Sequence, residues 1–155
     1  MSEKRILYII SMCILVIGMS CMKKYSVENF FLYIENGNID AIQELLENPE
    51  NVNFTDRSGK TALMHSIVNG AINKPLTLHY EIIQLFFEFG ANVNRVDHNG
   101  WSALFYALME NDEKAFLLLL ENGADFHIDI YGKTLFSHAI ELNKPAFVEI
   151  LRLYK

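Results

Sequence analysis

Histidine and cysteine are the residue types in this chain best suited to metal binding or nucleophilic catalysis, and the sequence contains five histidines and two cysteines. Both cysteines, Cys13 and Cys21, lie near the N-terminus. The rest of the chain therefore has no thiol for a disulfide, a thiolate metal site or a cysteine nucleophile. An H-E-x-x-H motif, a catalytic-serine signature, a phosphate loop and a dinucleotide fingerprint are all missing from the sequence. We therefore expect neither an enzyme nor a cofactor.

The strongest metal candidate is a short segment in which Asp125, His127 and Asp129 occupy alternate positions. Alternate residues of an extended segment point the same way, and Asp and His are both zinc ligands. The segment is, however, a second version of residues 92–97, which read Asn-Val-Asn-Arg-Val-Asp. We interpret it as part of a repeated structural pattern and expect no metal site.

That repetition extends through most of the chain. Residues 90–94, Gly-Ala-Asn-Val-Asn, return as residues 123–127, Gly-Ala-Asp-Phe-His, 33 positions later. The octapeptides at 56–63, 97–104 and 129–136 are also versions of one another, and each precedes two apolar runs separated by a polar break. A fixed period of this size is typical of a solenoid, in which each unit buries its apolar face only by stacking on its neighbours.

These motifs resemble the ankyrin-repeat family, whose unit is a β-turn and two helices with a D-x-x-G-x-T-P-L-H-x-A opening. The resemblance extends from Val27 to Lys155. It implies an all-α solenoid of about four helix-turn-helix units with short β-turn or hairpin tips, within a domain spanning residues 26–155. The expected units are residues 27–55, 56–96, 97–128 and 129–155, with breaks between their helices at Gly37, Gly70, Asn111 and Asn143.

The second unit is longer than the others because of a segment between its two helices, Ala71–Leu78. This segment contains Pro75, which is unsuited to a helix interior. We expect a surface excursion whose deletion would change the melting temperature by only a few degrees.

Residues at matching positions predict how each unit begins and packs. A hydroxyl should cap each first helix, and a pair of large apolar residues in each second helix should form the shared core. The expected caps are Thr61, Ser102 and Thr134, and the expected core pairs are Leu45-Leu46, Phe86-Phe87, Leu119-Leu120 and Ile150-Leu151.

One feature of the family's opening is missing. The histidine that helps to tie the family's turns together is replaced by Met64, Phe105 and Ser137. We therefore expect the turns to depend more on apolar packing and to be less rigid.

The first residues resemble the signal of a bacterial lipoprotein. Lys4 and Arg5 precede an apolar run, and Gly18-Met19-Ser20 then leads to Cys21. We expect residues 1–20 to be a signal peptide and Cys21 to become the lipidated N-terminus of a protein anchored outside the cytoplasm, although Gly18 stands where the motif usually has a large aliphatic residue. Cleavage without lipidation, giving a secreted or periplasmic protein, and a single-pass anchor are the alternatives.

The family resemblance implies a protein-binding surface made of the turn tips and the first helices. Trp101, the one tryptophan of the chain, lies at a tip, and tryptophan is enriched at binding hot spots. The alternative for Trp101 is packing against the stem of Lys60 or Lys133. The candidate partner-binding residues are Arg57, Lys60, His98, Asn99, Trp101, Met109, Glu110, Tyr131, Lys133 and Glu141.

The partner is expected to be another protein. A net charge of −6 with no basic cluster disfavours nucleic acid. We expect a monomeric, non-catalytic binding module. The alternative is an inhibitor or immunity protein that blocks a toxin or enzyme, for which an acidic concave face would suit a basic target. Residues 110–113, Glu-Asn-Asp-Glu, are either part of such a face or a solvated turn.

Overall fold

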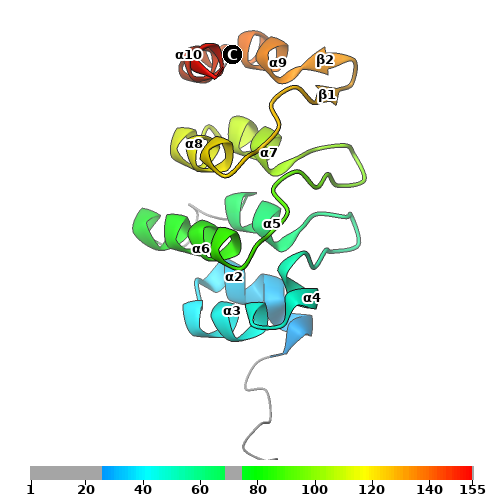
Figure 1. Cartoon of the computed structure of the whole chain (residues 1–155), viewed down its shortest axis with the longest axis vertical. Coiled ribbons are helices and arrows are strands. Elements are labelled where there is room, and N and C mark those ends of the chain that lie inside the picture. Colours follow the sequence, from blue (N-terminus) through cyan, green and yellow to red (C-terminus); the bar gives the residue numbers. More distant parts are fainter. Residues whose placement is uncertain (1–25, 69–74, 155) are drawn as a thin grey trace, which may run out of the picture.

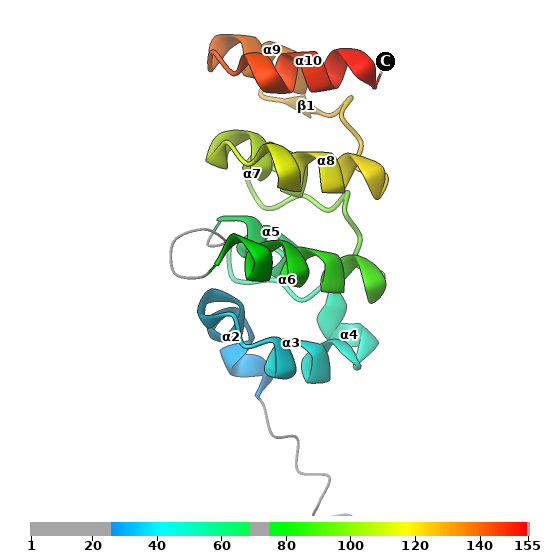
Figure 2. The same cartoon turned by 90° about the vertical axis from the view of Figure 1, so that its left-hand side faces the viewer.

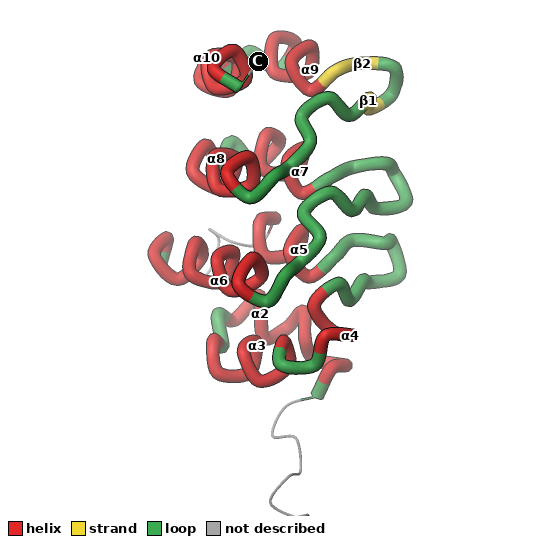
Figure 3. Tube along the Cα trace, in the orientation of Figure 1, coloured by secondary structure: helices red, strands yellow, loops and turns green. Residues whose placement is uncertain are grey.

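A computed structural model describes residues 26–68 and 75–154. Helices are stacked in pairs along the long axis of the molecule, and the loops between pairs project to one side (Figures 1 and 3). The pairs are α2 (Phe30–Asn36) with α3 (Ile39–Leu46), α5 (Ala62–Val68) with α6 (Leu76–Glu88), α7 (Ala103–Glu110) with α8 (Glu113–Glu121), and α9 (Leu135–Glu141) with α10 (Pro145–Leu153). The predicted all-α ankyrin solenoid is confirmed.

Two short helices and one hairpin complete the described elements. The 3-10 helix η1 (Val27–Asn29) precedes α2, and α4 (Pro49–Val52) follows α3. Strands β1 (Asp129–Ile130) and β2 (Lys133–Thr134) pair antiparallel in the last projecting loop. The two preceding loops have single bridges in the same place, between Thr55 and Thr61 and between Val96 and Ser102.

The turn between the helices of a pair depends on a residue with left-handed backbone. Gly37, Asn111 and Asn143 have φ values of 68°, 60° and 52°. Glycine has no Cβ to clash there, and asparagine tolerates this region better than most residues. Three of the four predicted breaks therefore lie where they were expected, and Gly70 falls outside the described residues.

The predicted hydroxyl caps are confirmed. Oγ1 of Thr61 accepts a hydrogen bond from the Met64 N–H at 3.2 Å, and Oγ of Ser102 accepts from the Phe105 N–H at 3.3 Å. Thr134 caps α9 in the same way. Each cap satisfies a backbone donor in the first turn that has no partner within the helix.

The core runs through the whole stack and contains the predicted pairs of the second helices. Both leucines of the α3 and α8 pairs are buried, as are Phe86 and Leu151, whereas Phe87 and Ile150 are half-buried. Aromatic rings also join successive units, because the ring of Phe116 meets that of Phe147 edge-on at 4.9 Å between centroids. The helix pairs lie one above another in both views (Figures 1 and 2). The buried apolar side chains therefore form one continuous core along the stack, which we call the apolar seam.

The expectation for the insertion is wrong in its last part. Helix α6 begins at Leu76, so Leu76–Leu78 form its first turn, and Leu78 packs against the core. Pro75 immediately precedes the helix, where its missing N–H is tolerated. A deletion of residues 71–78 would therefore remove part of a packed helix. Within this segment, residues 71–74 lie outside the described part of the chain.

None of the helices in the two described segments is long and apolar enough to span a membrane. The predicted signal peptide and Cys21 lie outside these segments.

Candidate functional site

An aspartate organises each of the first two turn tips. Oδ1 of Asp56 accepts hydrogen bonds from the N–H groups of Ser58 and Lys60, at 2.8 and 3.0 Å. Oδ1 of Asp97 accepts from the N–H groups of Asn99 and Trp101, at 2.8 and 2.9 Å. Such contacts close the turn onto one carboxylate.

These hydrogen bonds lower the pKa of both aspartates. Burial by itself would raise each pKa, since it disfavours the charged form. At Asp56 the donors are Ser58, His65 and the Lys60 N–H, and together they hold the pKa below its usual value. At Asp97 the donors are Tyr106, Trp101 and Asn99, with the same net direction. Both tips therefore contain an ionised carboxylate at neutral pH.

The turns are tied to the first helices by polar side chains, which corrects the expectation of apolar packing. His65 Nε2 lies 2.8 Å from Asp56 Oδ2, and the Tyr106 hydroxyl donates to Asp97 Oδ2 at 2.7 Å. His138 Nε2 donates to the Ile130 carbonyl at 3.0 Å.

His65, Tyr106 and His138, which make these bonds, each stand one position after the place where the family has its histidine. The sequence contained a signal for it, because 65, 106 and 138 each follow the turn aspartate (56, 97 and 129) by nine positions. The tips are therefore held by hydrogen bonds as well as by apolar contacts.

Adjacent tips also touch one another. The His98 N–H donates to the Ser58 carbonyl at 2.9 Å. The His98 ring lies so close to Gly59 that a Cβ there would approach ring atom Cδ2 to 2.6 Å. Gly59 has φ +80°, so its side-chain-free, left-handed backbone both closes one tip and admits the next.

Trp101 packs within an aromatic cluster that we define as Trp101, Phe105, Tyr106 and Tyr131. Its ring meets those of Phe105 and Tyr106 edge-on, with centroids 5.0 and 5.4 Å apart. Its Nε1–H donates to the Tyr131 hydroxyl at 3.1 Å, which joins the tip that contains Asp97 to the tip formed by the β1–β2 hairpin. The tryptophan is half-buried, whereas Tyr131 is 69% exposed.

The two lysines proposed as alternative packing partners of Trp101 have other contacts. Lys60 Nζ lies over the Tyr106 ring, 4.9 Å from its centroid. Lys133 Nζ forms a two-pronged ion pair with Glu141, at 2.7 and 2.8 Å. The packing contacts of the Trp101 ring therefore come from its aromatic neighbours, which cover part of the ring and leave the rest exposed.

The ten candidate residues fall into two groups. Seven lie on the turn tips, where Lys60 contacts the aromatic cluster and Lys133 forms an ion pair with Glu141 at the end of α9. Met109 and Glu110 lie at the far end of α7, about 10 Å from the tips along the helix axis. Lys60 and Trp101 are half-buried; Arg57, His98, Asn99, Met109, Glu110, Tyr131, Lys133 and Glu141 are exposed.

The acidic stretch at residues 110–113 contains one residue whose role the sequence did not reveal. Asp112 Oδ2 accepts from His79 Nε2 at 2.7 Å, and its Oδ1 accepts from the Tyr80 hydroxyl and the Ala115 N–H, both at 3.0 Å. Asp112 thus caps α8 and joins it to α6. Burial opposes its ionisation, but these hydrogen bonds outweigh burial and lower its pKa. Glu110 and Glu113 are exposed.

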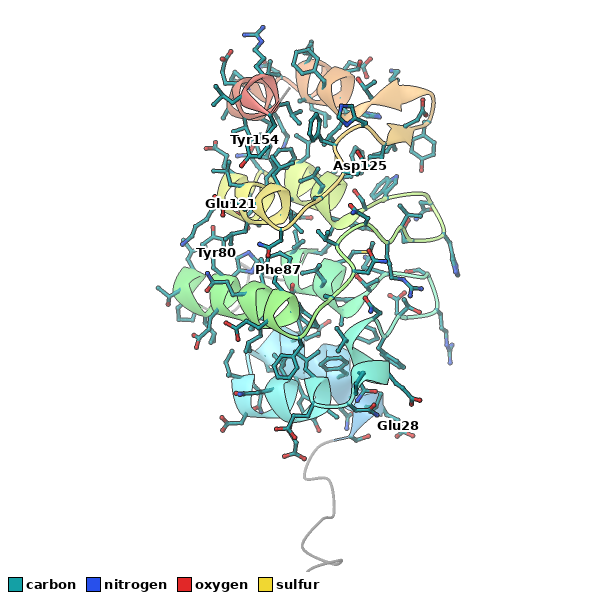
Figure 4. All side chains as sticks on the ribbon, viewed as in Figure 1. Glu28, Tyr80, Phe87, Glu121, Asp125 and Tyr154 are labelled. Atoms are coloured by element: carbon teal, nitrogen blue, oxygen red, sulfur yellow. The ribbon has the colours of Figure 1, made fainter. Side chains whose placement is uncertain are left out.

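The segment considered for metal binding has a structural role. Asn94 Oδ1 accepts from the Asp125 N–H at 2.8 Å, and its Nδ2 donates to the Gly123 carbonyl at 3.0 Å. Asp125 lies on the loop entering the last unit (Figure 4). Within residues 26–68 and 75–154, no group of three or more His, Cys, Asp or Glu residues is arranged to hold a metal ion.

Comparison with known proteins agrees with this architecture. The family model described as ankyrin repeats (3 copies) matches residues 30–129 and 76–154. Ankyrin repeat and SAM domain-containing protein 6 of Mus musculus is 30% identical over 128 residues, covering 81% of this chain and 14% of the mouse protein. Notch-regulated ankyrin repeat-containing protein of Xenopus laevis is 29% identical over 105 residues, covering 65% of this chain and 85% of that protein. An ankyrin repeat protein of Borreliella burgdorferi is 26% identical over 112 residues, covering 72% of this chain and 47% of that protein. The chain belongs to the ankyrin-repeat family.

Proposed function

We propose that this protein is a non-catalytic module that binds another protein through its turn tips and the adjoining first helices. Its ankyrin repeats indicate a protein–protein interaction module. The observation that carries the choice of surface is the aromatic cluster, in which Trp101 and Tyr131 join two tips and remain partly open to solvent. Tryptophan and tyrosine are enriched among residues that dominate binding energy.

The construction of the tips supports this surface. Backbone N–H groups of the turns donate hydrogen bonds to Asp56 and Asp97. His65 of α5 and Tyr106 of α7 also hydrogen-bond to these two carboxylates, so the backbone of the tips is fixed before a partner arrives. Preorganised loops lose less conformational entropy on binding. The tip that contains Asp56 also carries the exposed cation Arg57, so the tip surface is not uniformly acidic. This favours a general binding module over an inhibitor with a uniformly acidic face.

Trp101→Ala is expected to weaken partner binding by about 2 kcal/mol, or roughly 30-fold, because a partly packed aromatic anchor is lost. Immobilised parent and variant proteins would be used to capture partners, and calorimetry would then measure affinity for the captured protein. Trp101→Phe is the matched control, since it keeps the ring contacts with Phe105 and Tyr106 but cannot donate to Tyr131. A folded Trp101→Ala variant with unchanged affinity would place the binding surface elsewhere.

We further propose that the protein is exported and anchored to a membrane by lipid on Cys21. The support is the basic pair Lys4-Arg5, the apolar run and the small residues before Cys21. The first described helix, η1, begins at Val27, so the solenoid would lie close to the bilayer. Two or more acyl chains, at about 0.8 kcal/mol per buried CH₂, would make the attachment stable.

Mass spectrometry of the membrane fraction is expected to find an acylated Cys21 as the first residue. A free Cys21 at the N-terminus would indicate secretion instead, and an intact Met1 would exclude processing. Cys21→Ser supplies the control, because it should abolish the mass of the lipid and move the protein out of the membrane fraction.

A further inference from the structure

A cavity of about 370 Å³ opens where the end of α5 and the start of α6 meet the junction between α7 and α8. It lies at the end of the helices opposite to the turn tips. Ile67, Val68 and Leu76 provide apolar walls, and Tyr80 provides an aromatic face. The exposed carboxylates Glu110 and Glu113, together with Asn111, Asp112 and Lys114, complete the lining.

A cation already occupies the aromatic face. Lys114 Nζ lies 4.1 Å from the centroid of the Tyr80 ring, a distance typical of a cation–π contact. The Tyr80 hydroxyl donates to Asp112, which increases the electron density of the ring and so strengthens its attraction for a cation. Tyr80 projects from α6 toward α8 (Figure 4). Burial and the neighbouring Asp112 raise the pKa of Tyr80 to about 12, so the ring stays neutral at physiological pH.

Two of the three carboxylates in the cavity remain available to a ligand. Asp112 is occupied by His79, Tyr80 and the Ala115 N–H. Glu110 and Glu113 have no ion-pair partner among the described residues. The other nearby cation, Lys144, binds the Met109 carbonyl and Asn111 Oδ1 instead of either glutamate.

We propose that this cavity binds the side chain of an arginine presented by a protein partner. The planar guanidinium can displace the Lys114 ammonium and stack on Tyr80 while its N–H groups donate to Glu110 and Glu113, a combination that lysine cannot match. The methylene stem would contact the apolar walls. The source of the arginine rests on the proposed protein-binding function, but the cavity itself is separate from the aromatic cluster at the tips.

Arginine binding to the cavity can be tested without the partner. The isotopically labelled protein is titrated with Nα-acetyl-arginine amide and followed by NMR. Saturable shifts are expected for the Tyr80 ring and for the amides of residues 110–114, with affinity on the order of millimolar. The matched probe is Nα-acetyl-citrulline amide, which has the same shape without the charge and should bind about tenfold more weakly.

Variants at exposed positions define the contacts without threatening the fold. Glu110→Gln and Glu113→Gln should each weaken arginine binding severalfold, whereas Glu121→Gln, at the opposite end of α8, should leave it unchanged. Lys114→Ala should strengthen binding about two- to fivefold, because the competing cation is removed.

Three results would overturn the proposal. They are equal binding of the arginine and citrulline probes, the absence of saturable shifts at the cavity residues, and weaker arginine binding by the Lys114→Ala variant. These results are independent of capture by the Trp101 surface, so failure of the cavity and failure of the proposed function are distinguishable.

Discussion

Asp112→Ala is expected to lower the free energy of unfolding by about 3 kcal/mol. The carboxylate accepts hydrogen bonds from His79, Tyr80 and the Ala115 N–H, so truncation removes an N-cap and two side-chain partners at once. His79 is 1% exposed, and its Nδ1 already lacks a hydrogen-bond partner among the described residues. Loss of Asp112 would leave both ring nitrogens buried and unsatisfied, which costs more than the bond itself contributes.

Chemical denaturation of three variants would separate the contributions. Asp112→Asn retains a capping oxygen and should lose less stability than Asp112→Ala. Glu113→Ala is the neighbouring control, because Glu113 is exposed and should change stability by about 0.5 kcal/mol or less. A loss of less than about 1 kcal/mol in Asp112→Ala would mean that water replaces the carboxylate at little cost.

The same carboxylate predicts a dependence on pH. Because the pKa of Asp112 is lower in the folded protein than in the unfolded chain, its ionised form stabilises the fold fully above the unfolded pKa of about 3.9. This contribution is lost as pH falls through the lower pKa of the folded state. The stability difference between the parent and Asp112→Asn should therefore be largest above about pH 5 and should shrink under more acidic conditions.

Local chemistry made much of the fold predictable. The period of the glycines reveals the repeat. Within each unit, the hydroxyl caps and the left-handed positions at Gly37 and Asn111 follow from constraints within a few residues. Trp101 was likewise placed at a tip, because its octapeptide aligned with two others. Its bond to Tyr131 was not predictable, since it depends on the distance between adjacent units.

Contacts between units were harder to infer. His79 and Asp112 are 33 positions apart and lie on opposite sides of a unit boundary, with an insertion just before the histidine. The acidic residues around Asp112 favour a solvated turn. Aspartate just after a helix break is a good N-cap residue, but its bonds to His79 and Tyr80 of the neighbouring unit cannot be inferred from the local sequence. The start of α6 is hard to predict for a related reason. Proline is unsuited to a helix interior but favourable at a helix start, so Pro75 alone does not distinguish a loop from the beginning of a helix.

The α6–α8 contact differs in character from the rest of the stack. Along the first helices, α5 packs against α7 through apolar side chains. Between the second helices of the same two units, His79 and Tyr80 of α6 instead reach the cap of α8. The apolar seam therefore supplies most of the cohesion between these units, while the polar contact fixes how the second helices are aligned. These two contributions can be separated, because Asp112 tests the polar contact and a buried leucine of α8 tests the seam.

Leu119→Ala tests that seam and is expected to destabilise the protein by about 2–5 kcal/mol, because Leu119 is 0% exposed and truncation leaves a cavity between packed helices. In a repeat protein each unit is stable only against its neighbours, so loosening α8 should weaken the units on both sides and lower the main unfolding transition. Leu153→Ala is the matched control, since this leucine of α10 is 83% exposed and should change stability by about 0.5 kcal/mol or less. Thermal and chemical unfolding followed by circular dichroism would measure both. If Leu119→Ala unfolds within about 1 kcal/mol of the Leu153→Ala variant, the seam tolerates a cavity at α8 and the cohesion of the central units must come from the polar contact at Asp112.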